Sequence, residues 1–135
     1  LRTGFRKVGE EGILHASGVL AIDRSMYAVP AVRDVVFLPF SSLEERNEVY
    51  RFGGAANVAL NITKLSGIPE PIGVIGYDSF GTVFNSLLSE QNISHHGIIE
   101  DDSRPTTAKT RVIADSQHIV RIDKESKETI NKKVF

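Results

Sequence analysis

The spacing of apolar residues predicts two buried strands and two helices in the first two thirds of the chain. Residues 12–22 are apolar and small, and residues 72–75 form a second short apolar run, as expected of strands buried in a sheet. Residues 55–66 place apolar side chains three and four apart, which predicts an amphipathic helix. Asp78 precedes a second stretch with this spacing and is predicted to cap its N-terminus. Strands that alternate with helices predict an α/β fold with a parallel sheet.

The segments between and after these elements predict a smaller β part. Residues 25–30 are expected to form a turn, 35–38 an edge strand closed by a proline, and 41–51 a strand or a loop. Residues 93–99 are expected to form a strand. Residues 106–123 alternate polar and apolar positions on both sides of a two-residue centre, which predicts a hairpin. We therefore expect a β-flap and a hairpin beside the parallel sheet.

Composition narrows the class of protein without naming a function. The 135 residues are enough for one modest domain with a core of its own. A net charge of −1 gives no electrostatic reason to expect nucleic acid or an acidic membrane surface as a partner. The chain has no cysteine, which excludes disulfides and thiolate metal sites. No apolar run approaches the roughly 20 residues of a membrane span.

Two adjacent glycines, Gly53 and Gly54, stand at the entry to the first predicted helix, and Asn57 follows one turn later. Glycines at this position let a ligand approach the backbone N–H groups and the positive end of the helix dipole. The amide of Asn57 both donates and accepts hydrogen bonds. The segment therefore suits an anion or a polyol. A strand–helix turn that needs small residues only for packing explains the same residues.

The predicted hairpin carries two pairs of charged residues. Lys109 and Arg111 are two apart on a strand, which places them on one face about 7 Å apart and suits a phosphate carried by a substrate. An ordinary solvated strand face is the alternative. Arg121 and Asp123 also share a face, and they either belong to the same site or form a structural ion pair. A two-residue turn at 115–116 would direct Lys109 and Arg111 away from Arg121, whereas one extra residue would reverse this.

Taken together, four stretches resemble the ribokinase/PfkB family of carbohydrate kinases, and the last of them is similar to the heptose-7-phosphate kinases. The resemblance covers roughly residues 12–125, and the four stretches occur in the family's order. It implies a ribokinase-like three-layer α/β/α fold with a small β-lid, near residues 24–51 and 106–123. The four stretches are residues 18–24, 53–57, 73–81 and 105–123.

The resemblance implies transfer of a phosphoryl group from ATP to a hydroxyl of a sugar or sugar phosphate, with Mg²⁺ as cofactor. It assigns Asp23, Gly53, Gly54 and Asn57 to the sugar, together with Lys109 and Arg111. Arg121 and Asp123 are further candidates. No metal ligand is assigned. Val19 and Ala21 depart from the polar residues that related kinases carry.

The Gly-Ala-Gly-Asp segment, which in this family supplies the catalytic base and an anion hole, does not occur in the chain. Residues 1–135 are therefore expected to be the N-terminal, sugar-binding half of a kinase domain, without the ATP-binding half, so that neither the ATP nor the Mg²⁺ site is visible. The resemblance also implies a cytoplasmic protein and a homodimer formed through the flap strands. A kinase-like binding or scaffold protein without catalytic activity is the alternative function.

Overall fold

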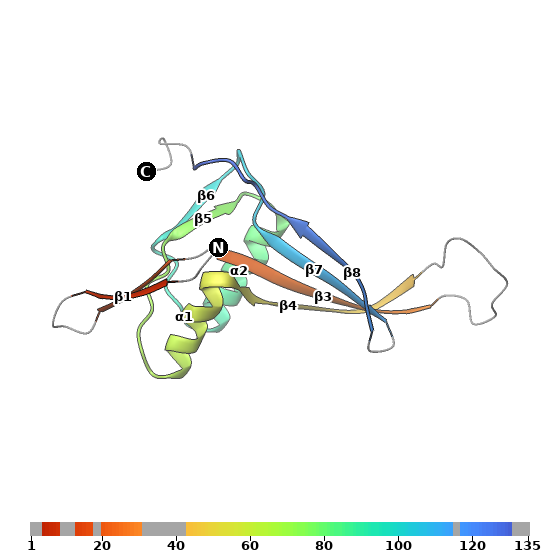
Figure 1. Ribbon diagram of the computed structural model, residues 1–135, viewed down its shortest axis with the longest axis horizontal. Helices are drawn as coiled ribbons and strands as arrows, with labels where there is room; N and C mark the ends of the chain where they lie inside the picture. The colour runs from red at the N-terminus through yellow and green to blue at the C-terminus, as the bar shows by residue number, and fades with distance from the viewer. Residues whose placement is uncertain (1–3, 9–12, 18–19, 31–42, 115–116, 131–135) are drawn as a thin grey trace.

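The computed structural model describes residues 4–8, 13–17, 20–30, 43–114 and 117–130 (Figure 1). Strands and helices alternate along the central part of the chain, which confirms the predicted α/β class. The elements are β1 (Gly4–Val8), β2 (Ile13–Ser17), β3 (Leu20–Pro30), β4 (Leu43–Gly53), α1 (Gly54–Lys64), β5 (Gly73–Gly76), α2 (Ser79–Glu90), β6 (Ile98–Asp101), β7 (Ala108–Ala114) and β8 (Gln117–Lys124).

The largest sheet has the strand order β4-β3-β7-β8. β3 is its centre: it runs antiparallel to β4 and parallel to β7, and β8 returns antiparallel to β7. β5 and β6 form a separate parallel pair, and β1 and β2 an antiparallel hairpin. In Figure 1 the long strands of the largest sheet extend away from the helices, whereas β5 and β6 lie above them. The sheet therefore reaches beyond the packed body as a ribbon.

The hydrophobic core lies where the first residues of β3 and the last residues of β4 meet the two helices. Ile22, Phe84 and Leu88 have no exposed surface, and Ile75 of β5 is 1% exposed. The rings of Phe52 and Phe84 meet edge to face, with centroids 5.5 Å apart, a favoured aromatic geometry. This core fixes the base of β3 and β4, and with it the position of the residues that follow on both strands.

Both predicted helices are confirmed. α1 buries Ala56 and Ala59, whose small side chains allow close packing against the sheet. α2 begins after Asp78, which caps it, and ends at Gln91. Asn92 follows with a φ of 54°, in the left-handed region that asparagine tolerates, so the chain turns sharply out of the helix.

The structure corrects two predictions in the β part, at 25–30 and 93–99, and decides between strand and loop at 41–51. The expected turn at 25–30 is strand, because β3 pairs with β4 as far as Pro30 and with β7 as far as Ala28. Residues 41–51 belong largely to β4, the partner that makes this extension possible. The expected strand at 93–99 is confined to β6, and the residues before it form a loop. The edge strand expected at 35–38 lies outside the described residues.

The N-terminal part also differs from the expectation. The buried strand expected at 12–22 is divided between β2 and β3, and β1, which was not predicted, pairs with β2. The predicted hairpin is confirmed as β7 and β8, with Ala114 opposite Gln117. Its register shifts between Val112 and Ile113, which defines a β-bulge.

Candidate functional site

An open hollow of about 380 Å³ lies beside β4 and α1. It brings together Asp23 of β3 and Asn57 of α1, two of the residues expected to hold a sugar. Both are polar, and aromatic and aliphatic side chains form much of the remaining wall, a combination that suits a polyol with an apolar face. The lining residues are Asp23, Tyr50, Arg51, Phe52, Asn57, Leu60, Leu87 and Gln91.

Glycine is favoured at positions 53 and 54 for two different structural reasons. A Cβ on Gly53 would lie 3.2–3.3 Å from the carboxylate atoms of Asp23, so this glycine makes room for that side chain. Gly54 has a φ of 56°, a conformation that glycine adopts without strain. Gly53 therefore contributes to the site through Asp23, which packs against it.

Asp23 also meets one of the predicted phosphate ligands. Arg111 Nη1 lies 3.3 Å from Asp23 Oδ1. The same oxygen is buried and accepts no hydrogen bond from the described residues. The ion pair with Arg111 offsets part of the cost of this missing hydrogen bond, and a donor from a ligand would supply the bond.

The strand register places the predicted phosphate ligands on the face that carries Asp23. Asp23 is opposite Lys109 in the parallel pair, and Arg111 follows two residues later. Lys109 Nζ lies 3.3 Å from Asp123 Oδ2 and 3.8 Å from Glu125 Oε2. Cations and carboxylates therefore alternate across β3, β7 and β8.

The bulge decides on which side of the hairpin Arg121 lies. A two-residue turn alone would have directed it away from Arg111, but β8 has one extra residue, Ile119, between the partners of Ile113 and Val112. Arg111 is consequently directly opposite Arg121, on the same face. The extra residue lies in the strand, where the alternation of polar residues does not reveal it.

Arg121 and Asp123 form the ion pair that the sequence left as one alternative. Arg121 donates from Nε to Asp123 Oδ1 at 2.8 Å and from Nη2 to Oδ2 at 3.0 Å. The hydrogen bonds from Arg121, joined by that from Lys109, hold the pKa of Asp123 below its usual range, and Asp123 raises the pKa of Arg121. Both groups are therefore charged at neutral pH.

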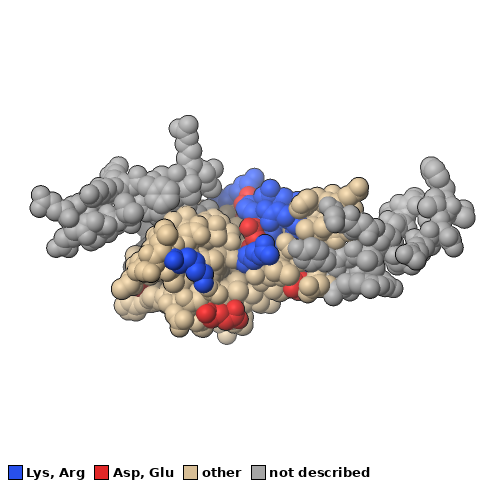
Figure 2. All heavy atoms as spheres, turned by 90° about the horizontal axis from the view of Figure 1, so that it is seen from below, with Lys and Arg blue, Asp and Glu red and all other residues tan. Residues whose placement is uncertain are grey.

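We call this set of side chains the charged face: Asp23, Lys109, Arg111, Arg121, Asp123 and Glu125. Its ionic groups are between 30% and 52% exposed, so solvent and solutes reach them. Figure 2, which shows the molecule from below, likewise has blue and red surface atoms next to one another near the middle of the view. The pairing of opposite charges distinguishes this surface from a purely basic patch.

Asp78, by contrast, serves the fold. Its Oδ1 accepts from Gly81 N at 2.9 Å, which confirms the predicted N-cap. Its Oδ2 accepts from Thr106 N at 3.2 Å and from Lys124 Nζ at 3.1 Å. Burial would raise the pKa of Asp78, but the hydrogen bonds from Thr106, Gly81 and Lys124 outweigh it and hold the pKa below its ordinary value. One carboxylate thus connects α2 with the bases of β7 and β8.

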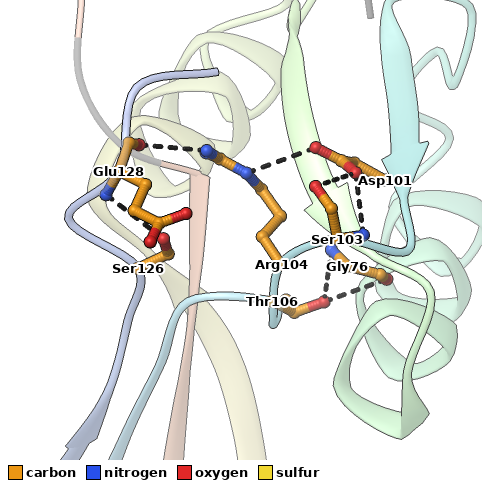
Figure 3. A network of polar contacts seen from close by, with 7 residues as sticks. All are labelled: Gly76, Asp101, Ser103, Arg104, Thr106, Ser126 and Glu128. Atoms are coloured by element: carbon orange, nitrogen blue, oxygen red, sulfur yellow. Dashed lines mark hydrogen bonds and ion pairs between the residues drawn. The ribbon is translucent and has the colours of Figure 1, made fainter. Parts of the chain in front are cut away.

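The hydroxyl of Thr106 completes this connection. It accepts from Gly76 N at 2.9 Å and donates to Gly76 O at 3.2 Å, and Thr106 has no exposed surface. Nearby, Arg104 reaches from Asp101 to the carbonyl oxygen of Glu128 (Figure 3). We call Gly76, Asp78, Gly81, Thr106 and Lys124 the joint, because they hold the ribbon strands to the body.

Sequence reasoning did not single out Thr106 or Lys124. Thr106 lies in the 105–123 stretch, but nothing in its spacing indicates a partner 30 residues away. Lys124 follows Asp123 and so points to the opposite side of β8, where it meets Asp78 and the ring of Phe80. Only the three-dimensional packing brings these residues together.

Comparison with known proteins decides the family. Residues 17–134 match the profile of the pfkB family carbohydrate kinases. The chain belongs to this family. The bifunctional protein HldE of Helicobacter pylori strain J99 is 45% identical over 93 residues, and that of Geobacter sulfurreducens is 42% identical over 92. These segments are 69% and 68% of this chain, and the chain spans only about a fifth of each relative's length (20% and 19%).

Solved structures support the same fold. A putative sugar kinase from Clostridium perfringens superposes with a TM-score of 0.61 at 14% identity, over 84% of this chain and 36% of that one. Ribokinase from Cryptococcus neoformans, solved in complex with ADP, gives a TM-score of 0.53 at 21% identity, over 78% and 32% of the two chains. At such identities the superpositions establish a ribokinase-like fold for this pfkB-family chain.

Two further features concern the described part of this pfkB-family chain, namely metal ligands and helix length. The described residues contain no group of three His, Asp or Glu side chains close enough together to hold a metal ion. Likewise, neither α1 nor α2 is long and apolar enough to span a bilayer. What the described residues do provide is a hollow with polar ligands and a charged face beside it.

Proposed function

We propose that this chain supplies the sugar-binding side of an ATP-dependent sugar kinase whose acceptor already carries a phosphate. The single observation that carries the proposal is the convergence of Asp23 and Asn57 at one hollow, with Lys109 and Arg111 in register on the adjoining strand. The acceptor class follows from the similarity to HldE proteins together with the resemblance to heptose-7-phosphate kinases.

Asp23 is the proposed acceptor for sugar hydroxyls. Its Oδ1 accepts no hydrogen bond from the described residues, and Gly53 leaves space against the carboxylate. Ala21, two residues earlier on β3, is buried and has an apolar side chain, which offers no hydrogen bond to a sugar. Asn57 is the second proposed sugar ligand at the hollow, and its amide, unlike the carboxylate, both donates and accepts.

The basic residues of the charged face support a phosphorylated acceptor. Arg111 and Arg121 offer planar forks suited to phosphate oxygens, and Lys109 adds a point charge. Arg111 and Arg121 also line a second hollow of about 320 Å³ between β7 and β8, together with His118. Two arginines directly opposite one another repel, and a bound phosphate would relieve that repulsion.

Other family properties are part of the same proposal. ATP is the expected donor and Mg²⁺ the expected metal, and no residue of this chain is assigned as catalytic base. We expect a cytoplasmic protein and a homodimer that pairs through flap strands. The segment that we propose for this pairing is 35–40, which lies outside the described residues. No comparison supports the alternative of an inactive scaffold.

The test is calorimetry on the complete gene product with a heptose 7-phosphate, for the wild type and Asp23→Asn. Loss of the carboxylate is expected to weaken binding about tenfold or more, because hydrogen bonds to a charged acceptor are the strong ones. Asp102→Asn, an exposed carboxylate outside the charged face, is the matched control. Equal affinity of the wild type and Asp23→Asn, or transfer of phosphate from ATP to no sugar, would contradict the proposal.

A further inference from the structure

Asp123 is the one carboxylate of the charged face that contacts two of its cations. Both of its oxygens accept from Arg121, at 2.8 and 3.0 Å, and Oδ2 also lies 3.3 Å from Lys109 Nζ. The two oxygens of this carboxylate bind a guanidinium and an ammonium, and a phosphate would bind the same two cations. Asp123 therefore lies where a substrate phosphate would find Arg121 and Lys109.

The charged face carries equal numbers of positive and negative groups. Three cations, Lys109, Arg111 and Arg121, face three carboxylates, Asp23, Asp123 and Glu125. With all six charged the surface is neutral, and a phosphate dianion gains little from a neutral surface. Binding becomes more favourable if one carboxylate gives up its cations.

Asp123 is the carboxylate best placed to do so. Asp23 is needed for the sugar in the proposed function, and Glu125 contacts only Lys109, at 3.8 Å. Arg121 is 52% exposed and Asp123 37% exposed, so the pair separates without opening the core. Arg121 also lines the hollow with Arg111 and His118, and a turn of its long side chain would direct the guanidinium there.

We propose that Asp123 is an internal counter-ion that competes with the substrate phosphate for Arg121 and Lys109, and thereby sets the preference for phosphorylated over unphosphorylated sugar. This inference rests on the proposed function. Without ligand, Asp123 keeps the two cations paired and limits capture of unrelated phosphates. With ligand, the phosphate takes over Arg121 and Asp123 turns to solvent.

The test compares wild type and Asp123→Asn in the complete gene product, with three probes: a heptose 7-phosphate, the same heptose without its phosphate, and inorganic phosphate. Asparagine keeps the size and removes the charge. We expect binding of both phosphate-bearing probes to tighten about three- to tenfold, the scale of partly exposed ion pairs, with the unphosphorylated heptose unchanged. Glu125→Gln is the graded comparison, with less than about a twofold gain, and Asp102→Asn the remote control with none.

The outcomes separate this inference from the proposed function. If the wild type prefers the phosphorylated heptose and Asp123→Asn weakens both sugars, Asp123 is a direct sugar ligand and the competition is overturned. If Asp123→Asn leaves all three affinities unchanged, the pair is only structural and the inference fails alone. If neither protein prefers the phosphorylated heptose, the proposed function and the inference fail together.

Discussion

The joint and the charged face connect some of the same strands by opposite means. In the joint, Gly76 and Thr106 exchange two hydrogen bonds out of contact with water, and the partners include backbone groups whose positions are fixed. On the charged face, Lys109, Arg111 and Arg121 pair only with other side chains, which are partly exposed. The Gly76–Thr106 contact at the centre of the joint is buried and fully hydrogen-bonded, whereas the charged face is paired and accessible.

The difference indicates where a ligand can act. Replacing Thr106 in the joint would leave the N and O of Gly76 without a hydrogen-bond partner, which costs free energy that a ligand cannot supply from outside. Replacing a carboxylate on the charged face exchanges one anion for another in contact with water. We therefore expect mutations in the joint to affect stability, and mutations on the charged face to affect binding.

The largest effect is expected for Gly76→Ala. Its Cβ would lie against the backbone N of Thr106 and 2.5 Å from the carbonyl oxygen of Arg104, so the chain must move. A loss of about 3 kcal/mol in the local free energy of opening is expected at β5 and β7, measured by native-state hydrogen exchange. Thr106→Val, which replaces the hydroxyl by a methyl group and leaves both backbone groups of Gly76 without that partner, is expected to cost about 1–3 kcal/mol.

Ser86→Ala provides the control, because this exposed position of α2 is expected to change stability by less than about 0.5 kcal/mol. Protection of β5 and β7 amides in Gly76→Ala equal to that in Ser86→Ala would contradict the description of the joint.

A smaller, pH-dependent effect is expected for Asp78. Asn at an N-cap keeps the bond to Gly81 N, whereas Ala loses it, so Asp78→Ala is expected to cost about 1 kcal/mol and Asp78→Asn less. Because the folded pKa lies below the reference value of 3.8, the charge stabilises the fold above that pH, and this stabilisation disappears as the pH falls through the folded pKa. Urea denaturation of wild type and Asp78→Asn at successive pH values measures it.

The advantage of wild type over Asp78→Asn should thus shrink on acidification below about pH 4. An advantage that grows below that pH would show that the carboxylate is not stabilised in its charged form.

The smallest effect on stability is expected for Arg121→Gln. The side chain is 52% exposed, and such ion pairs contribute little to folding because water solvates both charges when they separate. The denaturation midpoint is expected to stay within experimental error, while binding of a phosphorylated sugar weakens. A large drop in the midpoint would mean that the charged face holds the fold and would remove the contrast with the joint.

The sequence predicted the parts of the fold that short-range patterns encode. The helix at 55–66 and the cap at Asp78 follow from spacing and from the chemistry of one side chain, and both are confirmed. The expected turn at 25–30 is strand instead, because it lies on a ribbon held by backbone pairing with β4 along its length and with β7 as far as Ala28. Such partners come from 13 or more residues away and leave no local signal.

The candidate site was predictable as a set of residues and not as an arrangement. Asp23, Asn57, Lys109 and Arg111 were each expected at a sugar-phosphate site, and the structure brings Asp23 and Asn57 to one hollow and the two basic residues to the adjoining face. The side on which Arg121 lies depends on a single bulged residue, which reverses the facing of every residue after it. That reversal follows from strand pairing and cannot be seen in alternation alone.

The central claim is that the face carrying Asp23, Lys109 and Arg111 recognises a phosphate on a sugar. The most direct measurement is the ratio of affinities for a heptose 7-phosphate and the same heptose without phosphate, in wild type and Arg111→Gln. The ratio cancels effects that Arg111 exerts on the sugar through Asp23. We predict a ratio well above one in wild type that falls about tenfold in Arg111→Gln; an unchanged ratio would contradict the account.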